Sequence, residues 1–280
     1  MFDLHCHLLP GIDDGAADLE MALEMARIAV GDGIHTIACT PHLRPDTYDN
    51  TATGIRAAIK VLQAELDARD IKLELVEGAD VHLEPGLAGG IRRGRIPTLA
   101  GSHYLLLEPS HEIVPPRLEE VMFELMTIGI TPVVTHPERL RWIETHYDLF
   151  VRLAGRGVWM QVTAGALTGR FGKRVQYWGE RFVGEGHCQI LATEAHHPQR
   201  RPPLLAEARA AAAVLVGRDA AEHMVVTRPA GVIADVDPAT LPPPLAAIKG
   251  FHPTASIRPE AQANPGNALQ RILRGLRRRG

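Results

Sequence analysis

M-F-D-L-H-C-H-L-L-P-G-I-D-D-G, at positions 1–15, is a short apolar run that carries His5 and His7 and ends in two aspartates. Side chains alternate between the two faces of a β-strand, so the two histidines point to one face and Cys6 to the other. The Pro-Gly pair that follows predicts a turn, which returns Asp14 and its neighbour toward the end of the strand. Because neutral imidazole is a common ligand of divalent cations, we expect a metal site here.

Short β-like segments alternate with helical ones along most of the chain beyond this stretch. The predicted strands cover residues 2–5, 36–39, 73–80, 104–108, 132–135, 158–162 and 189–193. Helices are predicted between them, including one that begins after an Asp18 N-cap and ends at Gly31. Seven such units in succession predict a parallel, closed or nearly closed α/β barrel.

Length, composition and charge narrow the class of protein. The 280 residues suffice for one large domain or two small ones, and a hydrophobic fraction of 45% indicates a globular core. A net charge of −3 gives no general attraction to nucleic acid or anionic lipid. We find no apolar run long enough to span a bilayer and no signal-peptide character in the first residues. Cys6, Cys39 and Cys188 have no metal-type spacing, so we expect a reducing, cytoplasmic environment.

The composition changes after Asp237. Four prolines lie between positions 238 and 244, and five arginines lie between positions 271 and 279. This pattern is typical of a linker followed by a solvated, charged tail. We therefore expect one domain over residues 1–237, and a Pro-rich linker with a basic, disordered tail over residues 238–280.

Side chains that can bind metals recur where the predicted strands end. In a β/α barrel the C-terminal ends of all strands meet at one rim, which is where active sites lie. The candidate ligands at that rim are His5, His7, Asp14, His42, Asp80, Glu108, His136, Glu194 and His196. Because the series repeats after nearly every strand, it predicts a site for more than one metal ion.

The types of ligand indicate both the metal and the chemistry. Nine ligands exceed what one ion needs, since zinc takes four and an octahedral ion six. Imidazole and carboxylate without thiolate favour manganese, iron or zinc over calcium. Such a centre lowers the pKa of a bridging water and holds phosphoryl oxygens, which suits hydrolysis of a phosphate ester. Arg139 and Arg201 follow two presumed ligands, and their guanidinium groups match phosphate oxygens.

Eight motifs in order carry a resemblance to a known family. They are H-C-H-L-L-P-G-I-D-D-G-A, T-P-H, E-G-A-D, I-P-T-L, L-L-L-E, T-H-P-E-R, Q-V-T-A-G-A-L-T-G-R-F-G and R-R-P-P. Together they resemble the polymerase-and-histidinol-phosphatase (PHP) superfamily, and within it the bacterial capsule and exopolysaccharide tyrosine-protein phosphatases. The resemblance covers roughly residues 1–235.

The resemblance implies a distorted seven-stranded β/α barrel with a three-metal centre, often of manganese. By the family's pattern, one ion is held by His5, His7, Asp80 and Glu194, a second by Asp14, His42 and His196, and a third by Glu108 and His136 with Asp80 bridging. Arg139 and Arg201 match the arginines that contact phosphate. The implied substrate is phosphotyrosine on a bacterial tyrosine kinase that controls polysaccharide export. Phenol has a pKa near 10, so the leaving group needs little acid assistance, although His42 or His196 could protonate it.

Two ligands depart from the family's usual pattern. The family has Glu where this chain has Asp80, and Asp where it has Glu194. One carboxylate is therefore a methylene shorter and the other a methylene longer. We hypothesise that the two changes offset each other by a small shift of the ion that both bind.

Two other hypotheses remain open at this stage. The chain could be a PHP phosphoesterase acting on a small phosphate ester such as histidinol phosphate, or a regulator that binds its kinase with weak or no hydrolysis. The mechanism of the cysteine-dependent tyrosine phosphatases is excluded, because it needs an arginine six residues after the cysteine. Those positions hold Ile12, Pro45 and Glu194. An oligomer is compatible with this sequence.

Overall fold

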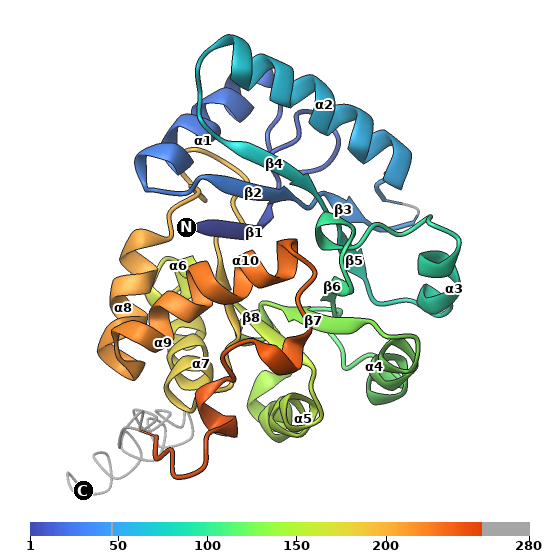
Figure 1. The fold of residues 1–280 in the computed structure, drawn as a ribbon. Helices are drawn as coiled ribbons and strands as arrows, with labels where there is room; N and C mark the ends of the chain where they lie inside the picture. Colours follow the sequence, from blue (N-terminus) through green and yellow to red (C-terminus); the bar gives the residue numbers. More distant parts are fainter. Residues whose placement is uncertain (46, 254–280) are drawn as a thin grey trace, which may run out of the picture.

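Parallel strands form the centre of the molecule. The structure is a computed structural model that describes residues 1–45 and 47–253. Its strands are β1 (Phe2–Cys6), β2 (Thr36–Cys39), β3 (His42–Leu43), β4 (Glu74–Glu77), β5 (Asp80–His82), β6 (Tyr104–Glu108), β7 (Thr131–Thr135), β8 (Trp159–Thr163) and β9 (Ile190–Ala192). They form a sheet with the order β1-β2-β4 and a second sheet with the order β3-β5-β6-β7-β8-β9 (Figure 1).

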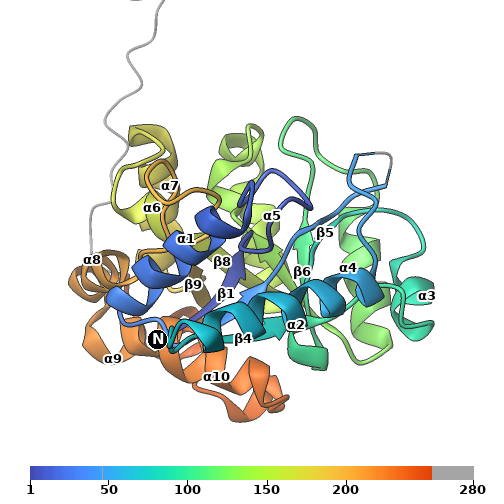
Figure 2. The ribbon, with the colours of Figure 1, turned by 90° about the horizontal axis from the view of Figure 1, so that it is seen from above.

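Helices connect the strands, and most of them cover the outer face, whereas the last one lies across one end of the strands, as the two views show (Figures 1 and 2). They are α1 (Leu19–Gly31), α2 (Ala52–Ala68), α3 (Leu87–Arg92), α4 (Leu118–Thr127), α5 (Ile143–Gly155), α6 (Ala164–Leu167), α7 (Lys173–Gly184), α8 (Ala206–Val216), α9 (Arg218–Glu222) and α10 (Arg228–Ile233). The predicted N-cap of α1 is confirmed, since the Asp18 carboxylate accepts a hydrogen bond from the Met21 amide at 2.9 Å. Within the described residues, none of these helices has the length and apolar character needed to cross a membrane.

The predicted strand 73–80 is wrong as a single element, because it is divided between the two sheets. Gly78 lies at the break between β4 and β5, where a Cβ would approach Thr40 Cγ2 to 2.9 Å. The neighbouring segment of the same chain is broken at the same level. Strand β2 pairs with β4, and β3, which follows β2, pairs with β5. The sheets are also connected at β1, where the Glu194 amide donates to the His5 carbonyl at 2.7 Å.

One face of the strands surrounds an apolar interior. Its buried residues are Leu4, Ala38, Leu99, Tyr104, Leu106, Val133, Trp159, Ile190, Ala192 and Val232. Along β6, Tyr104 and Leu106 belong to this interior while Leu105 and Leu107 pack under the helices, as the two-residue period of a strand requires. Continuing that alternation directs Glu108 to the interior side at the C-terminal end of β6.

The first strand departs from simple alternation. Its register against β2 shifts between Asp3 and Cys6, so β1 contains an irregularity of the β-bulge kind. Leu4 belongs to the interior cluster, and the next residue, His5, reaches Gln161 on the interior face of β8. A bulge re-aims a side chain in this way next to many functional sites, and here it turns His5 toward the end of the interior.

The chain stays packed beyond the expected domain end at residue 237. Arg228 is buried and donates to the carbonyl oxygens of Pro242 and Pro243, each at 2.8 Å, and burial lowers its pKa to about 10. Leu241 packs against the interior cluster. The first part of the predicted linker therefore closes the N-terminal end of the strands. The predicted basic tail at positions 271–279 lies outside the described residues.

Candidate metal centre

The nine predicted ligands lie together where strands end or are interrupted. His5 and Glu108 are in the last residues of β1 and β6, and His7, Asp14, His136, Glu194 and His196 come after β1, β7 and β9. His42 and Asp80 are instead the first residues of β3 and β5, so Asp80 begins a strand and does not end one as the sequence predicted. Within the described residues, their ligand atoms form overlapping groups whose members are within 4.8 Å of one another. The groups are His7, Asp14, His42 and His196; His5, His7 and Asp80; His5, His136 and Glu194; Glu108, His111 and His136; and His42, Asp80 and Glu108. Because the groups share members, they describe one continuous centre and not several separate sites.

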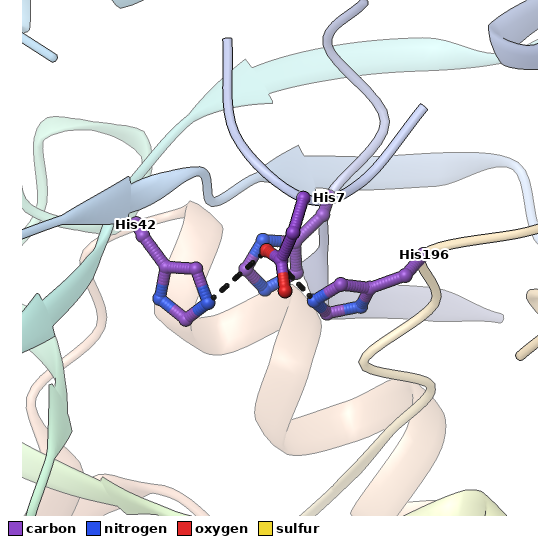
Figure 3. Close-up of side chains that lie close together, drawn as sticks. His7, His42 and His196 are labelled. Carbon is purple, nitrogen blue, oxygen red and sulfur yellow. Dashed lines mark ion pairs between the residues drawn. The ribbon is translucent and has the colours of Figure 1, made fainter. Parts of the chain in front are cut away.

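His7, His42 and His196 converge on one point with Asp14 (Figure 3). Asp14 Oδ1 lies 3.4 Å from His42 Nε2 and 3.5 Å from His196 Nε2. The rings of His7 and His196 have centroids 3.7 Å apart. Three imidazoles and a half-exposed carboxylate in this geometry match the ligand preferences of a first-row divalent cation.

The arrangement of His5 and His7 indicates whether these residues suit a metal ion. His7 Nδ1 donates to Asp13 at 2.7 Å and His5 Nδ1 donates to the Gln161 amide oxygen at 2.8 Å, so both protons are on Nδ1. The two Nε2 atoms therefore face each other at 3.2 Å with lone pairs and no proton between them. A cation that binds both nitrogens would stabilise this arrangement, so the residues fit a metal.

Asp80 supports the same conclusion. It is fully buried, and neither carboxylate oxygen has a hydrogen-bond partner in the described part of the chain. Its Oδ2 lies 3.6 Å from His5 Nε2 and 3.5 Å from His42 Nδ1. Burial, with the charges of Glu108 and Glu194, raises the pKa of Asp80 well above its ordinary value. A buried carboxylate of this kind needs a neutralising charge, and a bound cation would provide it.

Three of the histidines are in the protonation state that metals bind. Burial lowers the pKa of His5 to about 4, despite the opposing charge of Glu194. Burial also lowers the pKa of His7 and of His136 well below the ordinary value. All three rings are neutral at pH 7, and a neutral ring has a free nitrogen lone pair.

Glu108 and His136 gain a partner that the sequence analysis did not select. His111 Nε2 lies 3.3 Å from Glu108 Oε1, and His82 Nδ1 lies 3.7 Å from Glu108 Oε2. Burial alone would raise the pKa of Glu108, but the nearby imidazoles of His111 and His82, with those of His136 and His42, outweigh it and lower the pKa. His111 lies three residues beyond the end of β6, so no strand-end signal marked it.

Glu194 lies between the expected metal centre and both candidate arginines. Arg139 Nη1 donates to Glu194 Oε2, and Arg201 Nη2 lies 2.6 Å from Oε1. Burial would raise the pKa of Glu194, but Arg139, His136 and Arg201 lower it well below its ordinary value. Glu194 and His136 both have positive φ, 51° and 34°, which is uncommon for residues other than glycine and concentrates at functional sites.

Asp13 and Glu138 are further residues that the sequence did not single out. Asp13 orients His7, and its carboxylate also accepts the amides of Gly15 and His42. Glu138 is fully buried and accepts the Thr163 amide at 2.9 Å, and burial raises its pKa to about 7. The only feature of the sequence that could have indicated Asp13 or Glu138 is its position next to a predicted site residue.

Gly15 provides a prediction about how the first motif positions its ligands. A Cβ at Gly15 would come within 2.2 Å of the His7 carbonyl oxygen and 2.5 Å of the His7 Cβ. Gly15→Ala should therefore displace His7 and weaken manganese binding by about 10- to 100-fold, as measured by calorimetric titration. Gly31→Ala is the control, because no atom lies within 4 Å of its Cβ position. Unchanged manganese affinity in Gly15→Ala would show that the turn does not position His7.

The fold and site define an α/β protein with parallel strands and a histidine- and carboxylate-rich centre suited to several divalent cations. The chain belongs to the family described as "Capsular polysaccharide synthesis, CpsB/CapC", which matches residues 1–234. This agrees with the resemblance that the motifs indicated.

Named relatives and a solved structure agree with this family. Tyrosine-protein phosphatase YwqE of Bacillus subtilis is 34% identical over 201 residues, which cover 72% of this chain and 79% of YwqE. The putative tyrosine-protein phosphatase CapC of Staphylococcus aureus is 30% identical, over 73% of this chain and 80% of CapC. A crystal structure from work on YwqE of Bacillus subtilis and CpsB of Streptococcus pneumoniae, described as unique metal-dependent tyrosine phosphatases, superposes with a TM-score of 0.83. It has 30% identity and covers 91% of this chain and 100% of its own.

Proposed function

We propose that this protein is a metal-dependent phosphotyrosine-protein phosphatase. The observation that carries the proposal is the position of Glu194, which belongs to a ligand group with His5 and His136 and is ion-paired with Arg139 and Arg201. Phosphate-binding cations and phosphate-binding guanidinium groups would therefore act at the same point. The metal-dependent tyrosine phosphatases among the relatives support this assignment.

The strand arrangement supports a finer description of the fold. We infer that the strands form a distorted seven-stranded β/α barrel, in which β2 with β3 and β4 with β5 each count as one interrupted strand. The parallel bridge between Cys6 and Ala195 supports closure between the first and last strands. In such a barrel the C-terminal rim is the expected place for catalysis.

The residues of the centre suit hydrolysis of a phosphate monoester. Bound divalent cations, which we propose to be three manganese ions, would generate a hydroxide nucleophile at neutral pH and neutralise phosphoryl charge. Arg139 and Arg201 would donate to the phosphoryl oxygens, for which their planar guanidinium groups are well shaped. His42 and His196 lie on the side of Asp14 and belong to the same ligand group. Either ring could protonate the departing phenolate only while it is not bound to a cation, because a ring nitrogen that binds a metal carries no proton.

The cellular context is also a proposal. The family description refers to capsular polysaccharide synthesis, which supports a bacterial tyrosine kinase of that process as the substrate. Cys6, Cys39 and Cys188 are all free and buried, which is compatible with a cytoplasmic location.

The proposal is tested by comparing substrates on the manganese-loaded protein. We expect a phosphotyrosine peptide to be hydrolysed with a kcat/KM at least about 100-fold above that for histidinol phosphate. The reverse preference would assign the protein to small phosphate esters. Full manganese loading without turnover of either substrate or of p-nitrophenyl phosphate would indicate a binding protein and refute the enzymatic proposal.

The two unusual ligands give a separate prediction. If Asp80 and Glu194 compensate each other, Asp80→Glu and Glu194→Asp should each lower manganese-supplemented activity by about tenfold, and the double variant should recover most of it. A fully buried Asp80 leaves little room for another methylene, which is the physical reason for the single-variant loss. A large gain of activity in either single variant would contradict compensation.

A further inference from the structure

The motif Q-V-T-A-G-A-L-T-G-R-F-G forms a compact loop beside the metal centre. It runs from the end of β8 through the short helix α6 to Gly172 at the start of α7. The Arg170 amide donates to the Gly165 carbonyl at 2.9 Å, and the Gly172 amide donates to the Gly169 carbonyl at 3.1 Å. Gly169 and Gly172 have φ values of 75° and 82°, a conformation that favours glycine.

This loop holds Phe171 in a fixed place. A Cβ on Gly165 would approach Phe171 Cε2 to 2.8 Å, so the absence of a side chain at position 165 makes room for the ring. Phe171 is partly buried and packs against the main hydrophobic core. Its position therefore depends on glycines whose spacing the motif contains.

The ring of Phe171 lies against both candidate phosphate-binding arginines. The Cζ of Arg139 lies 4.9 Å from the ring centroid, and that of Arg201 lies 6.0 Å from it. A guanidinium group within about 6 Å of an aromatic centroid is attracted by the negative face of the ring. Phe171 thus contacts two cations that come from different parts of the chain.

Arg139 and Arg201 need an aromatic partner because the carboxylate that pairs with them, Glu194, is also a candidate metal ligand. Both guanidinium groups pair with the single carboxylate of Glu194, which also belongs to a metal-ligand group. Charge that Glu194 shares with a metal is not fully available to hold two like-charged groups together. The aromatic face attracts both arginines without neutralising them, so their charge stays available to an anion.

We propose that Phe171 is a positioning residue that keeps Arg139 and Arg201 together in the geometry that binds the phosphate group of the substrate. The inference rests on the proposed function and deepens it, because it assigns a role to the loop motif in the same site. Phe171 acts through the two arginines and contacts none of the reacting atoms.

The test measures binding of inorganic phosphate to the manganese-loaded protein by calorimetry. Phe171→Leu keeps an apolar side chain but removes the aromatic face, and it should raise the Kd for phosphate by about tenfold. Phe171→Tyr keeps the ring and should stay within about twofold of the parent protein. Phe123→Leu is the matched control, since Phe123 is an exposed residue of α4, and it should leave the Kd unchanged.

Manganese content and melting temperature are measured for each variant. An unchanged Kd in Phe171→Leu would overturn the proposal, and so would equal weakening in Phe171→Tyr, because packing alone would then explain the effect. A loss of manganese in Phe171→Leu would overturn it too, since the ring would then support the metal centre. If the parent protein binds phosphate in a Phe171-dependent way but does not hydrolyse phosphotyrosine, the proposed function fails and the role of Phe171 stands.

Discussion

His7→Ala should lower hydrolysis of a phosphotyrosine peptide by about a thousandfold or more and should remove more than one manganese ion per chain. His7 belongs to two ligand groups, one with Asp14 and one with Asp80, whereas the family's pattern assigned it to one ion. Its Nε2 lies 3.2 Å from that of His5, close enough for both nitrogens to bind one cation, so loss of one ring also weakens the site of the other. A single substitution should therefore affect two neighbouring ions.

Metal analysis and melting curves check this result. Manganese should raise the melting temperature of the parent protein, because a ligand that binds only the folded state stabilises it, and the rise should be much smaller in His7→Ala. His35→Ala is the control, since His35 is exposed and directly precedes β2, at the end of the strand opposite the metal centre. Parent-like manganese content in His7→Ala would contradict a shared role for His7.

The sequence predicted that these candidate ligands would lie close together because the signal for each of them is local. Strand β6 has the predicted bounds, and the two-residue period directs Glu108 to the interior face at its C-terminal end. His136 and Glu194 likewise follow the ends of β7 and β9. Parallel strands share one rim, so a ligand after each strand is enough to predict that the ligands meet.

Other features depend on contacts that no local pattern contains. The break at Gly78 lies where the chain packs closely against Thr40, which is far away in the sequence. No local pattern marks this contact, so the sequence predicted a single strand over residues 73–80. His111 lies beside Glu108 only because the loop after β6 folds back toward the end of that strand. The sequence placed Phe171 in a motif but did not predict its role, because the two arginines that it contacts come from distant parts of the sequence.

The electrostatics of the rim favour the presence of both cations and arginines there. Asp80 and Glu194 are buried, and the Glu108 side chain is 12% exposed. Burial, together with the charges of Glu108 and Glu194, raises the pKa of Asp80. A substrate phosphate would add further negative charge. Without cations the arginines oppose only part of this charge, since both are directed at Glu194.

Arg139→Lys and Arg201→Lys should each lower kcat/KM for a phosphotyrosine peptide by about 100- to 1000-fold while leaving manganese content unchanged. Lysine keeps the charge but loses the planar fork that can bind two phosphoryl oxygens at once. Because both arginines pair with Glu194 and would bind one phosphate, the double variant should lose less than the product of the single effects. Arg141→Lys is the matched control, since Arg141 is 73% exposed and pairs with Glu112. A fall in manganese content in either single variant would instead mean that the arginine acts by holding Glu194 in place, and direct contact with phosphate would then be refuted.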